Sequence, residues 1–143
     1  HPGADGWRVL VLRRAPGVRC TGAWEVVHGS VEPGERPPAA AVREVREETG
    51  LAVSRLYNLT AHPFYLHKLD VVQVAVAFVA LVDSPDALDT VVRGAEHDAH
   101  EWLTLDDAVE RIAWPRARAN LRDAHALLKS GDAGPVEDVL RVL

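Results

Sequence analysis

The chain has 143 residues, 48% of them apolar, which is the size of one compact domain with a substantial core. Its formal net charge of −5 and the absence of long Lys or Arg runs disfavour a broad surface for duplex nucleic acid. The sequence contains no apolar stretch of membrane-spanning length, and its one cysteine, Cys20, cannot form an internal disulfide. We therefore expect a single domain over 1–143, located in the cytoplasm, with no membrane partner.

The first third of the chain predicts two strands and a long loop. Residues 7–14 are dense in Val and Leu, as in a buried strand, and Ala15-Pro16-Gly17 signals a turn. A short strand is expected over 24–27, followed by an irregular loop over 28–37. The chain opens with His1-Pro2-Gly3, without an initiating Met, so we expect a short N-terminal strand to be missing.

A helix follows this loop and is the best-defined predicted element. Pro37-Pro38 suits the first turn of a helix, and 39–49 consists largely of strong helix formers. Gly50 stands where a helix commonly ends in a left-handed residue. The pattern therefore predicts a helix that ends at Thr49.

Beyond the helix we expect three strands and then a helical C-terminus. Strands are predicted over 52–61, 69–82 and 97–103, and helices from Thr104 to about 113, from Pro115 to about 131 and from Pro135. The Val-rich run 69–82 fits a central strand, and Phe64 and Tyr65 fall in a loop rich in His and Pro. Strands that do not alternate strictly with helices indicate an α/β fold (α+β, mixed sheet) with the sheet packed between helices.

Three glutamates share one face of the predicted helix. Glu44, Glu47 and Glu48 have spacings of i, i+3 and i+4, which places them within an arc of roughly 100°. One interpretation is a solvated acidic face neutralised by Arg43 and Arg46. The other is a binding site for a hard cation, since Mg²⁺ prefers carboxylates and shares them with substrate phosphates.

The residues around these glutamates decide between the two interpretations. Gly29, then Glu35 after five residues, then REVREETGL over 43–51 after seven more, match every constrained position of the Nudix box. A chance match in a chain of this length has a probability on the order of 10⁻⁷ or less. The chain thus resembles the Nudix (MutT-like) hydrolase family, and this resemblance implies an α/β/α sandwich with a helical C-terminus.

The box positions also have physical reasons. Gly29 and Gly34 permit the backbone angles of a tight loop folded against the start of the helix. Arg43 has the planar fork that can clamp Glu35 or Glu47 with two hydrogen bonds and so fix the loop. The resemblance implies that Glu35 is chiefly structural, and we expect the same of Gly29 and Gly50.

The resemblance further implies the metal chemistry. Carried over position by position, Glu47 and Glu48 are metal ligands, Glu44 ligates metal or shapes the site, and the His28 carbonyl is a further ligand. The cofactor is Mg²⁺, with Mn²⁺ as a substitute, and Glu44, Glu47 and Arg43 belong to the catalytic set. The reaction is attack by water on a phosphorus of a nucleoside diphosphate derivative.

The general base is sought outside the box. The segment from Glu96 to Leu103 resembles one in MutT-like members in which a Glu five residues before a Glu-Trp pair reaches the metal. By position this residue is Glu96, which we predict as general base and further metal ligand. The alternatives are an ordinary charged loop residue, or Asp98 or Glu101 in the same role.

Three further residues are candidates for substrate contacts. Arg13 and Arg14 stand at a strand end that faces the nucleotide in similar enzymes. Trp24 is the stacking candidate for a base, with burial as its alternative, and the same alternatives apply to Trp114. None of the seven histidines has a clear zinc-ligand spacing.

Two segments bear on the substrate. Residues 24–32 resemble the approach to the box in bacterial dATP and dihydroneopterin triphosphate pyrophosphatases. The pattern over 96–103 occurs there and in diadenosine tetraphosphate hydrolases. We expect a small-molecule partner, a (deoxy)nucleoside or pterin triphosphate cleaved to monophosphate and pyrophosphate, by a monomer or homodimer. The alternatives are a dinucleoside polyphosphate hydrolase and, from another class, a catalytically silent Nudix nucleotide-binding module.

Overall fold

The computed structural model describes residues 2–3 and 6–143. Along the chain the elements are β1 (Pro2–Gly3), β2 (Gly6–Trp7), β3 (Val9–Arg14), β4 (Trp24–Glu25), α1 (Pro37–Thr49), β5 (Arg55–Leu66), β6 (Val71–Leu81), η1 (Pro85–Leu88), β7 (His97–Leu103), α2 (Leu105–Arg111), α3 (Pro115–Leu128), η2 (Gly134–Val136) and α4 (Glu137–Leu140). No helix in this described part is long and apolar enough to cross a membrane.

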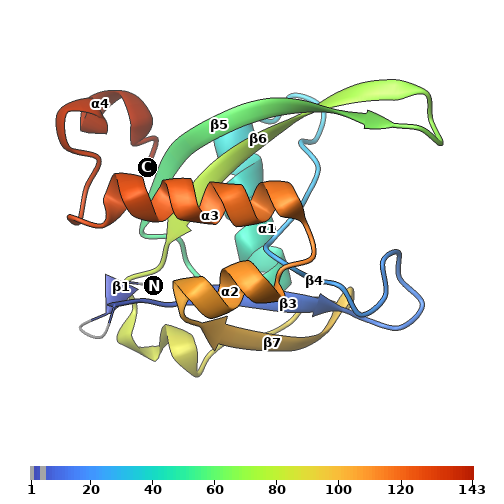
Figure 1. Ribbon diagram of the computed structural model, residues 1–143, viewed down its shortest axis with the longest axis horizontal. Helices are drawn as coiled ribbons and strands as arrows, with labels where there is room; N and C mark the ends of the chain where they lie inside the picture. Colours follow the sequence, from blue (N-terminus) through green and yellow to red (C-terminus); the bar gives the residue numbers. More distant parts are fainter. Residues whose placement is uncertain (1, 4–5) are drawn as a thin grey trace.

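The strands form a layer with helices on both sides. Figure 1 shows α2 and α3 in front of the strands and α1 behind them. The strands pair in three ladders, β4-β3-β7, β5-β6 and β1-β2, and the pairs given for these ladders are antiparallel. The expected α/β/α layering with a helical C-terminus is confirmed. The strands form separate antiparallel ladders, whereas the sequence indicated one mixed sheet.

The two faces of β3 pack against different helices. Val9 and Val11 lie in a cluster with residues of α2 and α3, while Leu10, between them, packs with Val45 of α1. Successive side chains of a strand point to opposite faces. At the end of β3 the same alternation therefore places Arg14 on the α1 side and Arg13 on the α2 side.

Several predicted elements are confirmed closely. Strand β7 has the predicted bounds, 97–103. Helix α2 begins after Thr104, whose hydroxyl oxygen accepts a hydrogen bond of 3.2 Å from the backbone N–H of Asp107. Helix α3 begins at Pro115, as expected for proline in a first helical turn, and ends at Leu128.

The strand predicted over 69–82 is found, but the prediction that it is a central strand was wrong. Within the described residues β6 pairs only with β5, and its first half is exposed, with Val72 and Val74 at 68% and 66%. Valine suits any pleated strand, so a Val-rich run indicates a strand but does not prove that it is central. Figure 1 shows the far end of this ribbon reaching beyond the helices.

Two other segments also differ from the prediction. Phe64 and Tyr65 lie in β5, not in a loop, because β5 continues through Pro63, which stands opposite Val74. A proline lacks only the N–H donor, which a strand at the edge of a ribbon can spare. Strand β4 ends at Glu25 instead of residue 27, and the long loop begins there.

Candidate active site

Helix α1 presents its glutamates because its caps and apolar side are fixed. Pro37 and Pro38 occupy its first turn, and Gly50 ends it with φ of 73°, donating to the Arg46 carbonyl at 2.9 Å. Thr49 is buried and Val45 packs toward β3, so the sector of the three glutamates is left for the site. The expected C-terminal role of Gly50 is confirmed.

Arg43 ties the box loop to the acidic helix. Its Nε and Nη2 donate to the two carboxylate oxygens of Glu35, each at 3.0 Å, which is the bidentate clamp expected from the sequence. Nη2 also donates to the Ser30 carbonyl at 2.9 Å. Nη1 donates to Glu44 at 2.8 Å and to Glu47 at 3.2 Å. One guanidinium thus holds three carboxylates and the loop backbone.

The two box glycines differ in what they provide. Gly34 has φ of 82°, in the left-handed region that favours glycine, whereas Gly29 has no such angle. At Gly29 the constraint is space, since an added Cβ would lie 1.9 Å from Cδ of Glu44. This close approach lets the neighbouring Ser30 N–H donate to the Glu44 carboxylate at 3.2 Å. The predicted backbone role of Gly29 is therefore corrected to one of close packing.

Glu48 is the least satisfied carboxylate of the site. Its Oε2 is buried and accepts no hydrogen bond from any residue that the structure describes. Burial, followed by the nearby negative charges of Glu44, Glu25 and Glu96, raises the pKa of Glu48 to about 7, although His28 opposes the shift. A buried carboxylate oxygen among other carboxylates is a ligand set suited to a hard cation.

A hydrogen-bonded loop brings Glu96 to this helix. The backbone N–H groups of Val92 and Gly94 donate to the Thr49 and Glu48 carbonyls, at 2.9 and 3.0 Å. A Cβ at Gly94 would meet Cα of Glu48 at 3.4 Å, so the loop lies directly against the helix end. The loop that leads to Glu96 therefore lies beside the acidic helix, and the roles of Glu96 as general base and metal ligand stay predictions.

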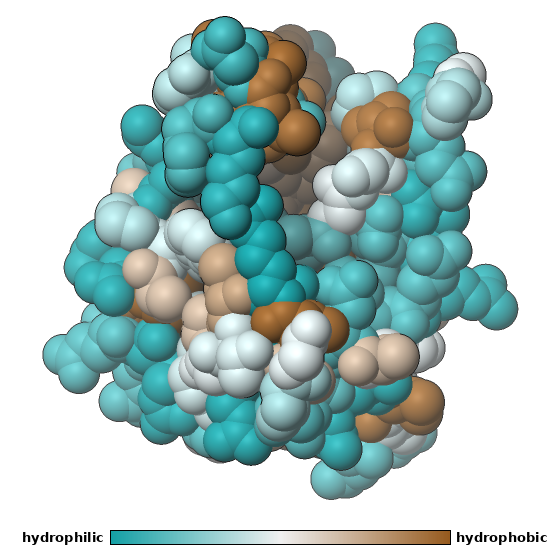
Figure 2. All heavy atoms as spheres, turned by 90° about the vertical axis from the view of Figure 1, so that its right-hand side faces the viewer, coloured by the Kyte–Doolittle hydropathy of each residue, from teal (hydrophilic) through white to brown (hydrophobic). Residues whose placement is uncertain are grey.

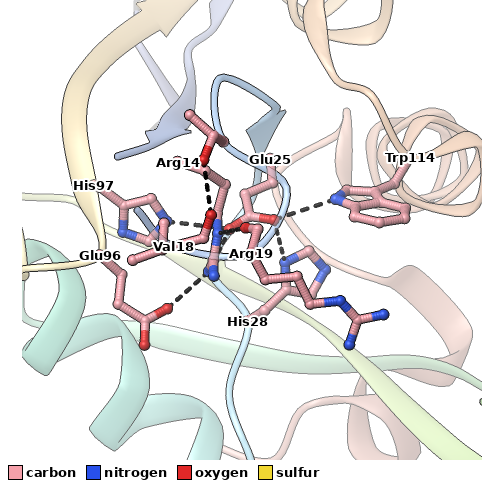
Figure 3. Close-up of polar contacts among 9 residues, drawn as sticks. Arg14, Val18, Arg19, Glu25, His28, Glu96, His97 and Trp114 are labelled. Atoms are coloured by element: carbon pink, nitrogen blue, oxygen red, sulfur yellow. Dashed lines mark hydrogen bonds and ion pairs between the residues drawn. The ribbon is translucent and has the colours of Figure 1, made fainter. Parts of the chain in front are cut away.

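Sequence reasoning missed Glu25, a buried acid of the site with partners on both carboxylate oxygens. Its side chain is only 6% exposed, and Figure 3 shows its partners converging on it. Oε1 pairs with Arg14 and with His97 Nε2, both at 3.2 Å. Oε2 accepts from Trp114 Nε1 at 3.2 Å and lies 3.5 Å from His28 Nδ1. Four groups from four separate segments therefore surround one carboxylate.

These hydrogen bonds outweigh the cost of burial. Burial alone would raise the pKa of Glu25, but hydrogen bonds from His28, His97 and Trp114 lower it to about 2. The sequence indicates the burial of Glu25 only weakly. Its inward direction follows once β4 is known to pair with β3, where Glu25 lies opposite the buried Leu12. His97, which showed no zinc spacing, is buried as a partner of Glu25.

The two arginines at the end of β3 are separated. Arg14 is 17% exposed on the α1 side, and its Nη1 donates to Glu96 at 2.8 Å as well as to Glu25. Arg13 instead forms a bidentate pair with Asp98, at 2.8 and 3.1 Å. The structure therefore brings Arg14, but not Arg13, to the glutamates.

Trp24 also lies away from the acidic helix. It stands opposite Arg13 in the β3-β4 ladder and packs on the cluster formed with α2 and α3. The guanidinium carbons of Arg13 and Arg111 lie 5.8 and 5.0 Å from its ring centroid. Trp24 is thus held by two arginines on the face opposite Arg14.

The described carboxylates of the site do not form a metal cage with their present protein partners. Within residues 2–3 and 6–143 no three Asp, Glu, His or Cys side chains form a ready metal cage. Glu44 and Glu47 are both paired with Arg43. The donors are nevertheless of the right kind for Mg²⁺ or Mn²⁺, and the partnerless buried oxygen of Glu48 fits a cation.

Comparison with known proteins agrees with this geometry. The NUDIX domain family model matches residues 3–124. The chain is 39% identical over 119 residues to an octanoyltransferase of Myxococcus xanthus, covering 83% of this chain but only 32% of that protein. It is 29% identical over 124 residues to the asymmetrical bis(5'-nucleosyl)-tetraphosphatase of Rattus norvegicus, covering 87% of this chain and 82% of that protein.

A solved structure gives the same picture. The Escherichia coli dihydroneopterin triphosphate pyrophosphohydrolase superposes with a TM-score of 0.66 at 26% identity, over 80% of this chain and 83% of that one. The fold, the complete box and the family match together define a Nudix hydrolase, an enzyme of the pyrophosphohydrolase class. The chain belongs to the NUDIX domain family.

Proposed function

We propose that this chain, as a single domain over 1–143, hydrolyses a pyrophosphate bond in a nucleoside diphosphate derivative with the help of a divalent cation. The observation that carries the proposal is the Glu48 carboxylate, which is buried beside other carboxylates with one oxygen unpartnered. Such an arrangement destabilises the metal-free protein, and a bound cation offsets this cost. The supporting sequence is the complete box from Gly29 to Leu51.

The proposed ligands are Glu44, Glu47, Glu48, Glu96 and the His28 carbonyl. Bound Mg²⁺ or Mn²⁺ neutralises phosphate charge and lowers the pKa of a coordinated water. The protein's own contribution is positioning: Arg43 holds the first two glutamates and the box loop together through the contacts described above. Glu96, whose side chain is 60% exposed, is proposed to accept the proton of the attacking water.

We propose a (deoxy)nucleoside or pterin triphosphate as substrate, released as monophosphate and pyrophosphate. The likeness to the dihydroneopterin triphosphate pyrophosphohydrolase supports this choice. The likeness to the rat tetraphosphatase supports the second candidate, a dinucleoside polyphosphate. Arg14 is the proposed phosphate contact, whereas Arg13 and Trp24 lie on the other face of the sheet and are not retained. We further propose a cytoplasmic monomer or homodimer.

One panel of assays tests both the reaction and the substrate. Purified protein with Mg²⁺ or Mn²⁺ is incubated with nucleoside triphosphates, dihydroneopterin triphosphate and diadenosine tetraphosphate, and the products are separated by chromatography. We expect turnover of at least one compound, its loss in excess EDTA, and its return with added metal. Nucleotide binding without turnover under either metal would instead support the catalytically silent module, an outcome that the presence of all three box glutamates disfavours.

A further inference from the structure

Glu25 is a buried carboxylate beside the acidic helix, yet it is not among the proposed metal ligands. It stands at the end of β4, a strand of two residues. A charge in such a place is costly unless it is fully paired. Its donors come from β3, from the loop after β4, from β7 and from the residue before α3, all seen in Figure 3. One carboxylate therefore joins four parts of the fold.

Arg14 is the donor through which this junction reaches the site. Its Nη1 lies 3.2 Å from Glu25 and 2.8 Å from Glu96, and its Nε donates to the Arg19 carbonyl at 2.9 Å. The Glu25 side chain is 6% exposed and that of Glu96 is 60% exposed. The Nη1 group of Arg14 therefore links the buried Glu25 carboxylate to the exposed Glu96 carboxylate.

We infer that Glu25 is a positioning residue, which fixes the Arg14 guanidinium so that it meets the phosphate chain of the substrate beside the acidic helix. The inference rests on the proposed function, since it assigns an anionic substrate to this site. A guanidinium already fixed by one carboxylate loses less conformational freedom when it binds a phosphate. With a cation at Glu96, the Arg14 guanidinium would pair with a phosphate oxygen in place of that carboxylate while keeping its bond to Glu25.

A purely structural anchor makes a different prediction. If Glu25 only stabilised the fold, its replacement would lower stability without changing how Arg14 is held or how it contributes to turnover. Glu137→Gln supplies the matched control, because Glu137 is a half-buried carboxylate that also accepts hydrogen bonds, from Tyr57 Oη at 2.9 Å and from the Ala133 N–H at 2.8 Å. Glu137→Gln replaces a carboxylate by an amide, as Glu25→Gln does, but in helix α4.

The first test needs neither metal nor substrate. In ¹⁵N-labelled protein the Nε–H signal of Arg14 and the indole N–H signal of Trp114 are followed by NMR, after assignment with Arg14→Lys and Trp114→Phe. We expect Glu25→Gln to shift the Trp114 signal and to broaden the Arg14 signal through solvent exchange, and Glu137→Gln to leave both in place. An Arg14 signal unchanged in folded Glu25→Gln would overturn the inference.

A reciprocal variant guards against failure of Glu25→Gln to fold. Arg14→Gln removes one donor from the same carboxylate, so we expect it to shift the Trp114 indole signal, since Trp114 bonds the other oxygen of Glu25. An unmoved Trp114 signal in Arg14→Gln would count against the inference as well. Because these readouts require no turnover, they stand even if every substrate on the panel fails.

The second test measures coupling in the active enzyme. With Mg²⁺ and a substrate found by the panel, we expect Glu25→Gln and Arg14→Gln each to lower kcat/KM about 10- to 100-fold, as for other outer-shell changes. The double variant should be no more than about threefold worse than the worse single one, because both remove one contact. Glu137→Gln combined with Arg14→Gln should match Arg14→Gln alone. Losses that multiply for Glu25→Gln and Arg14→Gln would refute the positioning role.

Discussion

Two buried carboxylates of this site, Glu25 and Glu48, have opposite surroundings. Glu25 has four hydrogen-bonding partners and a pKa of about 2, whereas Glu48 has a buried oxygen without a partner and a pKa of about 7. Both residues are buried near negative charge, so burial alone does not separate them. The difference is the number of donors that the fold supplies. The satisfied acid holds the architecture together, and the unsatisfied acid is left for a ligand.

The largest expected effect is the loss of activity when the Glu48 carboxylate is replaced. Glu48→Gln keeps the shape of the side chain but removes the charge that a cation requires. We expect kcat to fall by about 10³-fold or more, which is about 4 kcal/mol of transition-state stabilisation. Steady-state assays at saturating Mg²⁺ measure this, with Glu110→Gln, an exposed glutamate of α2, as the matched control. Activity of Glu48→Gln within tenfold of the wild type would remove Glu48 from the proposed ligand set.

The lowered pKa of Glu25 is tested by the dependence of the free energy of unfolding on pH. The pKa of Glu25 is lowered in the folded protein from an ordinary 4.5 to about 2, so its ionised form stabilises the fold above pH 4.5. This stability is lost as the pH falls through 2, and it amounts to about 3 kcal/mol. Glu25→Gln lacks this contribution, so the two proteins should converge in free energy of unfolding at low pH.

Urea denaturation at several pH values measures this convergence. We expect the difference in unfolding free energy between the wild type and Glu25→Gln to shrink by about 3 kcal/mol between pH 5 and pH 2. Glu101→Gln, which removes an exposed carboxylate paired with Arg111, should follow the wild-type curve more closely. A constant difference across this range would mean that the hydrogen bonds from His28, His97 and Trp114 do not lower the pKa of Glu25.

A third variant asks whether the box loop positions a glutamate. Gly29→Ala places a Cβ 1.9 Å from Cδ of Glu44, so the carboxylate must leave Ser30 and Arg43. Because that carboxylate is the flexible end of its side chain, we expect a loss of about 1 kcal/mol or less in stability but a 10- to 30-fold loss in kcat/KM. In a Glu44→Ala background the same change should have no further effect. Equal losses in both backgrounds would show that backbone strain, not the clash, is responsible.

The sequence predicts the local parts of this site well. The helix ends and the Arg43 clamp on Glu35 follow from short-range patterns or from the box itself. Glu96 is selected by the resemblance of its segment to MutT-like members. Strand register is what the sequence lacks. Arg13 and Arg14 look equivalent until alternation along β3 assigns them to opposite faces. Glu25 is recognised as part of the site only when its ladder places it opposite Leu12. The exposed valines of β6 are misread for a related reason, since burial depends on which strands lie beside it.

The smallest expected effect is a gain in stability from Glu48→Gln, whereas most substitutions of buried residues lower the free energy of unfolding. Because the folded protein raises the pKa of Glu48 to about 7, its stabilising contribution is complete below pH 4.5 and is lost as the pH rises through 7. Without metal at pH 8, Glu48→Gln removes a buried charge and should raise the free energy of unfolding by about 1 kcal/mol, a figure reduced for partial exposure. Denaturation in EDTA measures this gain, and added Mg²⁺ should remove it by stabilising the wild type alone. A Glu48→Gln protein less stable than the wild type in EDTA would mean that the Glu48 carboxylate is satisfied without a cation, and that the contrast with Glu25 does not hold.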